Sequence, residues 1–443
     1  MENIKRILAL GSGSVSRPCV QYLLKRGYEV IAVDLSESSI KRTLACHPNG
    51  IGVVRNAVTD AVKLIREYKP ELVVCLLPAA YLTQTAAICV SEGISMIGAS
   101  YVRDELRAFD GEARRKGIKI LCEVGLDPGI DHMSAAAKIK EIREQGGVIE
   151  SFISACGALP DFTSNTNPIG YKLSWAPVSL VGASKRSARI MMGGEEIDLP
   201  NGTTYQNAEF FNVAGLGWFE AYANADSIPY LEAYGIESAK TIKRMTIRYF
   251  GWCDMITQMQ KLNLFDESER DFSSHTYASL LKELAGGDKT KNTEQSVSEF
   301  LGISEKSLVM LKLKWLGFFD DIPVKPQIGS LRGVLSGRYA EKLTFSPGEM
   351  DLVVMQHEYR AFYPQTGKRK KYISTMIERG SVDEDTAIAR TTGLPLGIAA
   401  HLVLEGAVKN NGVIIPATSD IYEPALKELS KEGIRFIERE EQI

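Results

Sequence analysis

The first residues in this chain that could do chemistry are two glycines in a short turn. The segment 10–18 reads Leu-Gly-Ser-Gly-Ser-Val-Ser-Arg-Pro. Gly11 permits a tight turn after a strand, and Gly13 lets the backbone come close to a pyrophosphate. A helix that begins near Ser14 would direct its unpaired N–H groups toward the same anion. The turn therefore predicts a phosphate cradle, although Ser16 stands where the dinucleotide fingerprint has Gly or Ala.

An acidic residue follows at the spacing expected of a dinucleotide site. Asp34 lies 21 residues after Gly13, at the end of the second predicted strand. A carboxylate there would accept hydrogen bonds from the adenosine ribose hydroxyls and would repel a 2′-phosphate. We therefore expect NAD as the cofactor, with NADP less favoured. The alternative is that Asp34 only caps the helix expected at residues 36–39.

These residues need a scaffold of short, buried strands. Apolar runs too short for helices recur at Ile7–Leu10, Val30–Val33, Gly52–Val54, Leu72–Leu77, Met96–Ala99 and Lys119–Cys122. The segments between them have helical spacing, and Gly27, Gly93 and Gly117 stand where helices would end. Continuous apolar strands joined by helices indicate a parallel sheet covered on both faces. The expected fold class is α/β, with a Rossmann-like, doubly wound domain at the N-terminus.

Polar and small residues follow three of these strands, at the edge where open α/β sheets bind ligands. Leu77 and Pro78 close the fourth strand, the run 99–101 closes the fifth, and residues 126–127 follow the sixth. The expected cofactor contacts are Gly11, Ser12, Gly13, Val15, Asp34, Leu77, Pro78, Ala99, Ser100 and Leu126.

Asp127 is the first candidate for acid–base chemistry. Its place directly beyond a strand would let it hold an amino group of a substrate or take up a proton. A turn-forming role before Pro128 is equally open. Asp131 and His132 open the next helix, where we expect Asp131 to be the N-cap and His132 to be a surface residue of the first turn.

Several strings along the chain resemble the L-glutamate-forming saccharopine dehydrogenase (saccharopine reductase) family. The most specific is Gly-Leu-Asp-Pro-Gly-Ile-Asp-His at 125–132. Further matches stand at 156–160, 167–175, 244–249, 389–395 and 421–424. The resemblance covers residues 1 to about 255 and about 340 to 436, whereas 256–335 match poorly.

The resemblance implies an enzyme of lysine metabolism that oxidises saccharopine with NAD and water to L-glutamate and 2-aminoadipate 6-semialdehyde. It also implies a three-part fold. We expect a Rossmann-like dinucleotide-binding domain at 1–130 and 390–443, and a mixed α/β substrate domain at 131–224 and 326–389. An inserted helical domain is expected at 225–325, where helical spacing predominates.

The resemblance also implies which residues meet the substrate. Saccharopine carries three carboxylates, and a guanidinium suits a carboxylate better than an ammonium does. Arg244 matches the family's substrate arginine. The expected substrate contacts are Ser100, Tyr101, Asp127, Ser174 and Arg244, and the candidate catalytic residues are Tyr101, Asp127 and Cys156.

Each of these assignments has a structural alternative. Arg244 could belong to a solvated face, Tyr101 could be a packed ring with a satisfied hydroxyl, and Cys156 could be a buried thiol. The Gly157 that follows Cys156 could instead let a substrate come close. Lys172 is a further candidate cation, and Trp175 could line the cleft beside Ser174.

Length and composition limit the remaining classes of function. The 443 residues suffice for two or three domains, and 52 Lys and Arg against 55 Asp and Glu imply no nucleic-acid partner. The apolar runs fall short of the ~20 residues that a membrane span needs. Seven dispersed cysteines and five dispersed histidines favour reduced thiols and no metal site. We expect a cytoplasmic protein whose oligomeric state is open, with a homodimer among the options.

Two other classes of function fit the same motifs. A related imine-reducing enzyme, such as a carboxynorspermidine synthase, would act on a diamine, whose positive charge disfavours Arg244 in the pocket. A non-catalytic NAD-binding sensor would keep the fold and lose the chemistry. The joint presence of Tyr101, Asp127 and Arg244 favours an enzyme.

Overall fold

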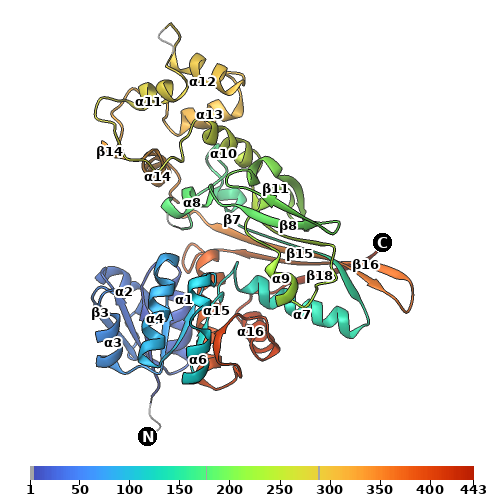
Figure 1. Cartoon of the computed structure of the whole chain (residues 1–443). Helices are drawn as coiled ribbons and strands as arrows, with labels where there is room; N and C mark the ends of the chain where they lie inside the picture. The colour runs from blue at the N-terminus through green and yellow to red at the C-terminus, as the bar shows by residue number, and fades with distance from the viewer. Residues whose placement is uncertain (1–3, 176, 288–289) are drawn as a thin grey trace. The chain divides into compact units, whose positions relative to one another are not determined.

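Two sheets organise this chain, and most of each sheet lies in its own unit (Figure 1). The structure is a computed structural model that describes residues 4–175, 177–287 and 290–443. Unit 1 comprises Met1–Val148, Tyr363–Gly367 and Met376–Ile437. Unit 2 comprises Ile149–Phe362, Lys368–Thr375 and Glu438–Ile443.

Unit 1 contains a seven-stranded sheet with the order β17-β6-β5-β4-β1-β2-β3, in which all neighbours are parallel. The strands are β1 (Arg6–Leu10), β2 (Glu29–Asp34), β3 (Gly50–Val54), β4 (Leu72–Cys75), β5 (Ser95–Gly98), β6 (Lys119–Leu121) and β17 (Gly412–Ile414). The first six follow the order 3-2-1-4-5-6 of doubly wound nucleotide-binding sheets. The Rossmann-like fold predicted from the apolar runs is confirmed.

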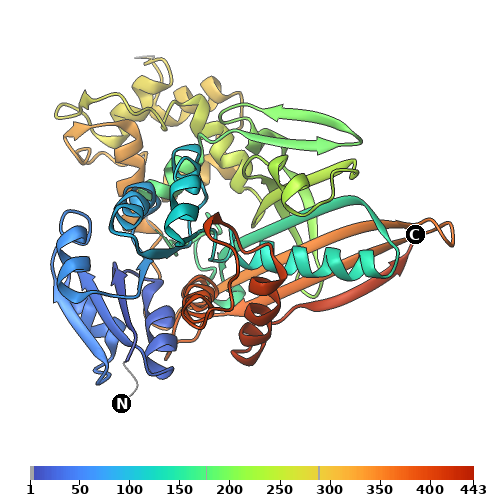
Figure 2. The same ribbon diagram turned by 60° about the horizontal axis from the view of Figure 1, so that its bottom comes forward.

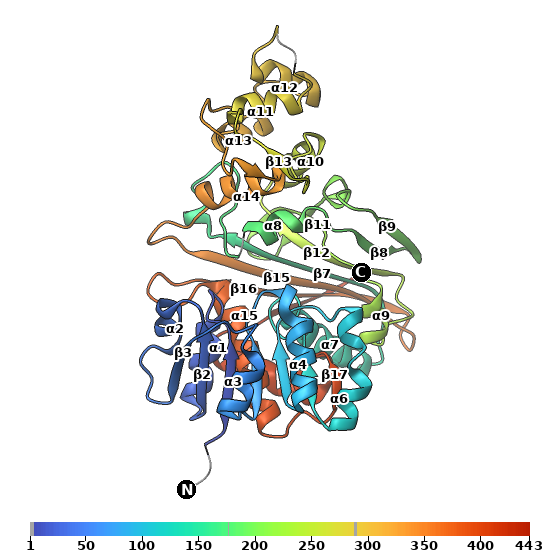
Figure 3. The same ribbon diagram turned by 60° about the vertical axis from the view of Figure 1, so that its left-hand side comes forward.

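Helices flank this sheet, as Figure 3 shows. They are α1 (Ser16–Lys25), α2 (Glu37–Leu44), α3 (Ala61–Tyr68), α4 (Leu82–Glu92), α5 (Asp104–Arg107), α6 (Asp110–Lys116), α7 (Ile130–Glu144), α15 (Ala387–Leu404) and α16 (Ser419–Lys431), with a 3₁₀ turn η1 (Ala79–Tyr81). The helices α3, α4 and α6 pack apolar side chains such as Leu64, Ala86 and Ala113 onto one face of the strands. The central strands β1, β2, β4 and β5 are buried along almost their whole length, which explains their uninterrupted apolar sequences, whereas the edge strand β3 is mostly exposed.

Helix α15 returns from the C-terminal part of the chain to brace the first helix. A Cβ on Gly393 would lie 2.5 Å from the carbonyl oxygen of Val15, and one on Gly397 would lie 3.0 Å from that of Cys19. Glycine at both positions thus lets the two helices touch backbone to backbone. By length and composition α15 could cross a membrane, but 67% of the stretch is buried within the fold, as in a core helix.

Unit 2 contains a nine-stranded mixed sheet with the order β10-β11-β12-β7-β15-β16-β18, and β8 and β9 extend it beside β12. The strands are β7 (Val148–Pro160), β8 (Ala188–Met192), β9 (Glu195–Leu199), β10 (Glu209–Val213), β11 (Gly217–Ala223), β12 (Thr241–Arg248), β15 (Asp351–Tyr363), β16 (Lys368–Arg379) and β18 (Ile437–Gln442). Figure 2 shows the long strands β15 and β16 in orange, with the C-terminal strand beside them.

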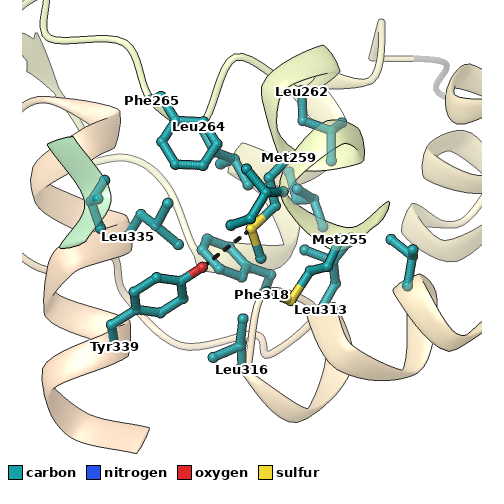
Figure 4. Packing of buried hydrophobic residues seen from close by; sticks show 14 of the residues in the cluster. Met255, Met259, Leu262, Leu264, Phe265, Leu313, Leu316, Phe318, Leu335 and Tyr339 are labelled. Atoms are coloured by element: carbon teal, nitrogen blue, oxygen red, sulfur yellow. Dashed lines mark hydrogen bonds between the residues drawn. The ribbon is translucent and has the colours of Figure 1, made fainter. Parts of the chain in front are cut away.

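The remaining elements of unit 2 are mostly helical. They are η2 (Phe162–Ser164), α8 (Pro177–Ala183), η3 (Thr204–Asn207), α9 (Pro229–Ala233), α10 (Trp252–Lys261), β13 (Arg270–Asp271), α11 (Tyr277–Leu284), α12 (Thr293–Leu301), α13 (Leu308–Trp315), β14 (Ile328–Gly329) and α14 (Leu331–Lys342). Thr276 and Asn292 begin α11 and α12 with capping boxes. Figure 4 shows the core between α10, α13 and α14, where the Tyr339 hydroxyl lies 3.6 Å from the Met259 sulfur.

The segment 225–325 differs from the helical expectation at its start. Residues Thr241–Arg248 form β12, a strand inside the mixed sheet, although Ile242 and Met245 have helical spacing with Leu231. This strand is buried on both faces, so no alternation of polar and apolar residues marks it. The helices from α10 to α14 belong to the same compact unit as the sheet, and the three-domain division stays a prediction.

Candidate functional site

The glycine turn has the geometry of a nucleotide cradle. Gly11 has φ +104°, and a Cβ there would lie 2.9 Å from the Leu76 carbonyl oxygen, so only glycine fits without a shift. A Cβ on Gly13 would meet nothing within 4 Å, so the space above it is open. Ser16 begins α1, and its hydroxyl donates a hydrogen bond to the Gly13 carbonyl oxygen at 2.7 Å. The serine that departs from the fingerprint therefore fastens the turn.

Asp34 also fastens this turn. One carboxylate oxygen accepts a hydrogen bond from the Ser12 amide at 2.8 Å, and the other accepts from the Ser36 amide at 2.9 Å. Ser36, not Asp34, is the N-cap of α2, with its hydroxyl accepting from the Ser39 amide. Both oxygens of Asp34 are thus engaged by its own backbone neighbourhood, so its placement does not depend on a ribose.

The other predicted cofactor residues gather at the carboxyl edge of the same sheet. Leu77 and Pro78 follow β4, and Ala99 and Ser100 follow β5. The Ser100 carbonyl oxygen accepts from the Glu123 amide at 3.2 Å, which ties the loop after β5 to the loop after β6. The predicted residues of these two loops are therefore held together in unit 1.

The loop after β6 is folded tightly around two glycines. Gly129 has φ +146°, and a Cβ there would lie 2.1 Å from the Gly125 carbonyl oxygen. The Gly125 amide donates to the Pro128 carbonyl oxygen at 2.8 Å, and the Ile130 amide donates to Gly125 at 2.9 Å. This loop brings the partly exposed Asp127 to the sheet edge.

Tyr101 and Asp127 meet at that edge. The Tyr101 hydroxyl donates a hydrogen bond to one Asp127 carboxylate oxygen at 2.8 Å. Both side chains remain partly exposed, so a ligand could reach them. A phenol joined to a carboxylate is a group that can accept a proton at one end and relay it at the other.

Sequence reasoning missed a buried residue that supports this pair. Glu123 has φ +58° and is 3% exposed. One of its oxygens accepts from the Val102 amide at 2.9 Å, and the other lies 2.8 Å from His132 Nε2. Glu123 therefore links the Tyr101 loop to α7. The only sequence signal was a lone acid inside the apolar run 120–126.

Two expectations for the start of α7 need correction. His132 is not a surface residue, because its side chain is fully buried against Glu123. Asp131 is not the N-cap, a position held by Gly129. Its carboxylate instead accepts from the Gly129 amide at 2.6 Å, so it still satisfies a backbone donor at the helix start.

Arg244 lies in unit 2, in the middle of β12. It is 1% exposed, and its guanidinium stands 4.5 Å from the centroid of the Tyr230 ring. Its amide donates to the Ser227 hydroxyl at 2.9 Å. Burial excludes the solvated-face alternative. A buried guanidinium stacked on an aromatic ring is held in one direction, as recognition of a carboxylate requires.

Cys156 lies on the neighbouring strand β7, in register with Thr246. Arg244 pairs with Ser154, two residues away, so Cys156 and Arg244 belong to one face of the sheet. Cys156 is 6% exposed. A Cβ on Gly157 would lie 2.8 Å from the Ile247 carbonyl oxygen, so this glycine serves strand packing rather than substrate approach.

The remaining predicted substrate residues follow β7. Ser174 is partly buried, and the half-exposed Trp175 donates from Nε1 to the Tyr171 hydroxyl at 2.7 Å. Lys172 is not a spare cation, because its ammonium is paired with Glu349. The predicted site residues thus divide between the units: Tyr101 and Asp127 on unit 1, and Cys156, Ser174 and Arg244 on unit 2.

A glycine turn after the first strand of a 3-2-1-4-5-6 parallel sheet defines a dinucleotide-binding protein of the Rossmann class. Family models refine this class: a saccharopine dehydrogenase NADP-binding domain matches residues 7–121, and a saccharopine dehydrogenase C-terminal domain matches 125–434. The chain therefore belongs to the saccharopine dehydrogenase family, which takes part in lysine metabolism.

Curated relatives resemble the chain along its whole length. A mitochondrial alpha-aminoadipic semialdehyde synthase of Bos taurus is 33% identical over 98% of this chain, which spans 47% of that protein. The chain thus spans about half the length of these relatives. The Pyricularia oryzae protein named saccharopine dehydrogenase, NADP(+), L-glutamate-forming, is 31% identical, with 98% of this chain and 99% of that protein covered.

A solved structure is also similar. It is an apo saccharopine dehydrogenase, L-Glu forming, from Saccharomyces cerevisiae. It matches with a TM-score of 0.87 and 26% identity, over 99% of this chain and 100% of that one.

The prediction of NAD as cofactor is wrong. The matched family model is an NADP-binding domain, and the fungal relatives are named for NADP(+). The physical reason lies at Asp34, whose two oxygens accept from the Ser12 and Ser36 amides. Both oxygens already accept from the backbone, so the position of Asp34 is explained by the turn itself, and its spacing alone does not indicate an unphosphorylated ribose.

Proposed function

We propose that this protein is an NADP-dependent, L-glutamate-forming saccharopine dehydrogenase. The observation that carries the proposal is the hydrogen-bonded Tyr101 and Asp127 pair, at the same sheet edge as the glycine turn. An acid–base pair at the edge where a dinucleotide binds suits an oxidation that releases a proton. The names of the relatives supply the substrate.

The residues around the glycine turn fit a phosphorylated dinucleotide. The N-terminus of α1 would receive the pyrophosphate. Arg42 on α2 is exposed and donates from Nη2 to the Gly13 carbonyl oxygen at 3.2 Å. A guanidinium beside this turn would hold the 2′-phosphate. When bound, the nicotinamide accepts a hydride from the substrate carbon.

The protein's own side chains would then manage one proton. Oxidation removes a hydride from the carbon that joins the lysine moiety to the secondary amine, and a proton from the nitrogen. Asp127 would take that proton, with the Tyr101 hydroxyl orienting the carboxylate at 2.8 Å. Water then adds to the C=N bond, and breakage of the C–N bond releases glutamate and the semialdehyde.

Unit 2 would supply the cation for a substrate carboxylate. Arg244 is fully desolvated by burial and fixed on Tyr230, so a charge-assisted bond to it would be strong. This feature disfavours the diamine alternative, since a cationic substrate would be repelled.

The test is the near-ultraviolet absorbance of reduced nicotinamide after the full chain is mixed with saccharopine and either NADP or NAD. We expect a rise with NADP that exceeds the rise with NAD, and glutamate among the products by mass spectrometry. An absence of any rise with saccharopine contradicts the proposed reaction. A larger rise with NAD contradicts the proposed cofactor. The cytoplasmic location and the lack of metal, nucleic-acid and membrane partners stay predictions from the sequence.

A further inference from the structure

The carboxyl edge of unit 1 contains two buried ionisable side chains that the proposed chemistry does not use. Glu123 follows β6 and is 3% exposed, and His132 lies in the first turn of α7 and is fully buried. One carboxylate oxygen of Glu123 lies 2.8 Å from Nε2 of His132. A carboxylate is seldom buried, because its removal from water is costly. A function for this pair is therefore expected.

Glu123 holds the Tyr101 loop on both sides of the tyrosine. Its amide donates a hydrogen bond to the Ser100 carbonyl oxygen at 3.2 Å, and its carboxylate accepts one from the Val102 amide at 2.9 Å. Residues 99–103 form neither a helix nor a strand, so hydrogen bonds of this kind fix their backbone. The position of the Tyr101 side chain therefore depends on Glu123.

The backbone of Glu123 has an unusual conformation. Its φ is +58°, in the left-handed region, which a residue with a long side chain adopts at a cost. Four other non-glycine residues of the described chain have a positive φ, and all of them follow helices, where this conformation is common: Ala45, Cys46, Lys69 and Asn263. Glu123 instead follows a strand, at the edge where ligands bind. Strained residues in such places are concentrated at functional sites.

His132 attaches the same carboxylate to the loop that carries Asp127. The carboxylate of the preceding residue, Asp131, accepts from the Gly129 amide at 2.6 Å, and the Asp131 amide donates to the Leu126 carbonyl oxygen at 3.2 Å. These two hydrogen bonds join the first turn of α7 to both sides of the loop. A displacement of His132 would therefore move the Asp127 loop as well.

These contacts form a closed ring that includes the acid–base pair. Tyr101 and Asp127 are joined by the 2.8 Å hydrogen bond between their side chains. Glu123 and His132 join the two loops from which these side chains extend. The first pair is partly exposed and the second is buried, so a ligand can reach only the first. A buried polar pair favours one fixed arrangement of the groups that it connects.

We propose that Glu123 and His132 are positioning residues, which hold Tyr101 and Asp127 in the geometry that proton transfer requires. This inference rests on the proposed function, which assigns the proton transfer to Asp127. The buried pair would exchange no proton with the substrate. It would fix the phenol and the carboxylate relative to each other before the substrate binds, so that no binding energy is used to order the two loops.

The first experiment measures the Tyr101 loop without turnover. Hydrogen exchange of the full chain, read by mass spectrometry, should be about tenfold faster at residues 99–103 in Glu123→Ala, because the Val102 amide loses its acceptor. Glu123→Gln keeps an acceptor and should change this rate less than about threefold. Exchange at β1 is the internal control for a folded chain. Unchanged exchange at residues 99–103 in folded Glu123→Ala overturns the inference.

The second experiment is a double-mutant cycle with Asp127→Asn. We expect Glu123→Ala alone to lower kcat/KM for saccharopine by about 10²-fold, because a small misplacement of a reacting group costs about that much. In the Asp127→Asn chain the same substitution should cost less than about threefold, since the group that it positions is already absent. A role in folding alone would lower the rate by the same factor in both chains, and that result overturns the inference.

The third experiment replaces the histidine. His132→Gln keeps a donor of similar reach, so kcat/KM for saccharopine should stay within about threefold of the wild-type value. His132→Leu keeps much of the volume but removes the polar contact, and it should lower kcat/KM by about 20-fold. Equal losses in the two variants overturn the inference, and this comparison decides the matter if Glu123→Ala does not fold.

His401 provides the matched control for the histidine variants. It belongs to the same unit, and its Nδ1 and Nε2 lie 2.8 Å from the Tyr28 hydroxyl and 3.0 Å from Nη1 of Arg26. His401→Leu should lower the melting temperature and leave kcat/KM within about twofold. A loss of activity as large as that of His132→Leu would mean that any lost histidine contact in this unit impairs turnover, and it overturns the specific role of His132.

These results separate the two proposals. A wild-type chain that does not oxidise saccharopine contradicts the proposed function, and the exchange rates still decide whether Glu123 holds the Tyr101 loop. A chain that oxidises saccharopine, but in which Glu123→Ala has the same effect with and without Asp127, keeps the proposed function and contradicts the positioning role.

Discussion

The two units prepare for their ligands in different ways. In unit 1 the predicted nucleotide edge is made of backbone and small side chains. Gly11 and Gly13 follow β1, and the residues they contact lie in and after the neighbouring strands. In unit 2 the candidate substrate residue Arg244 is a long cation buried in the middle of the strand β12. The backbone conformation of short loops therefore shapes the predicted nucleotide site, whereas the packing of distant side chains positions the predicted substrate residue.

The two units should therefore differ in how well they tolerate substitutions. Several residues predicted at the nucleotide edge, such as Gly11, Leu77 and Ser100, lie on loops after strands, where substitutions are tolerated more readily. Arg244 is desolvated among aromatic rings, so its replacement alters charge, packing and ligand affinity together.

The largest effect is expected at the acid–base pair. Asp127→Asn keeps the shape and an acceptor for the Tyr101 hydroxyl but removes the base, so kcat should fall by about 10³-fold. Tyr101→Phe, which leaves the carboxylate, should cost about tenfold. Steady-state rates with saccharopine check both. Equal losses in the two variants would mean that the carboxylate is not the base.

The next effect is expected at Arg244. Arg244→Met keeps much of the buried volume and removes the charge, and it should raise the KM for saccharopine by about 10²-fold. The KM for NADP should stay within twofold, because the nucleotide edge belongs to unit 1. A parallel rise in both constants would show that the substitution disturbs more than a carboxylate contact.

Cofactor choice should respond to Arg42. Arg42→Ala should raise the KM for NADP by about 20-fold and leave the KM for NAD nearly unchanged, because only NADP has a phosphate for the guanidinium. The ratio of the two constants is the measurement. A chain that still prefers NADP by the same ratio would assign the 2′-phosphate to other residues.

The smallest effect is expected from a pair of glycines. Gly13→Ala adds a methyl group in open space, so stability should hold and NADP binding should weaken by about fivefold. Gly11→Ala places a Cβ 2.9 Å from the Leu76 carbonyl oxygen at φ +104° and should destabilise unit 1 by about 1–2 kcal/mol. Thermal unfolding and cofactor titration of both variants separate the roles. Equal melting temperatures would contradict the assignment.

Much of unit 1 could be predicted because its signals are local. The apolar runs became β1 to β6, and Gly11 adopts the positive φ that the turn requires. The loop around Asp127 was recognised from a short, specific string. The prediction of NAD from the spacing between Gly13 and Asp34 was wrong. The number of residues between them cannot show that both carboxylate oxygens of Asp34 accept hydrogen bonds from backbone amides.

Unit 2 could be predicted less well because its signals are distant. The strand β12 carries helical spacing, and its pairing with β7 and β11 overrides that pattern. Unit 1 has one such case as well, since His132 has the position of a first-turn surface residue and is buried against Glu123. Lys172 looked like a spare cation until Glu349 neutralised it from 177 residues away.

The strands of the parallel sheet, the glycine turn and the family could be predicted from the sequence alone, since each of these signals comes from residues close together in the chain. Which charged side chains form ion pairs within the protein could not be predicted in this way and is visible in the folded chain. Ion pairs and desolvation depend on groups that meet in space from distant segments, so Lys172 is paired with Glu349 while Arg244 is buried against Tyr230.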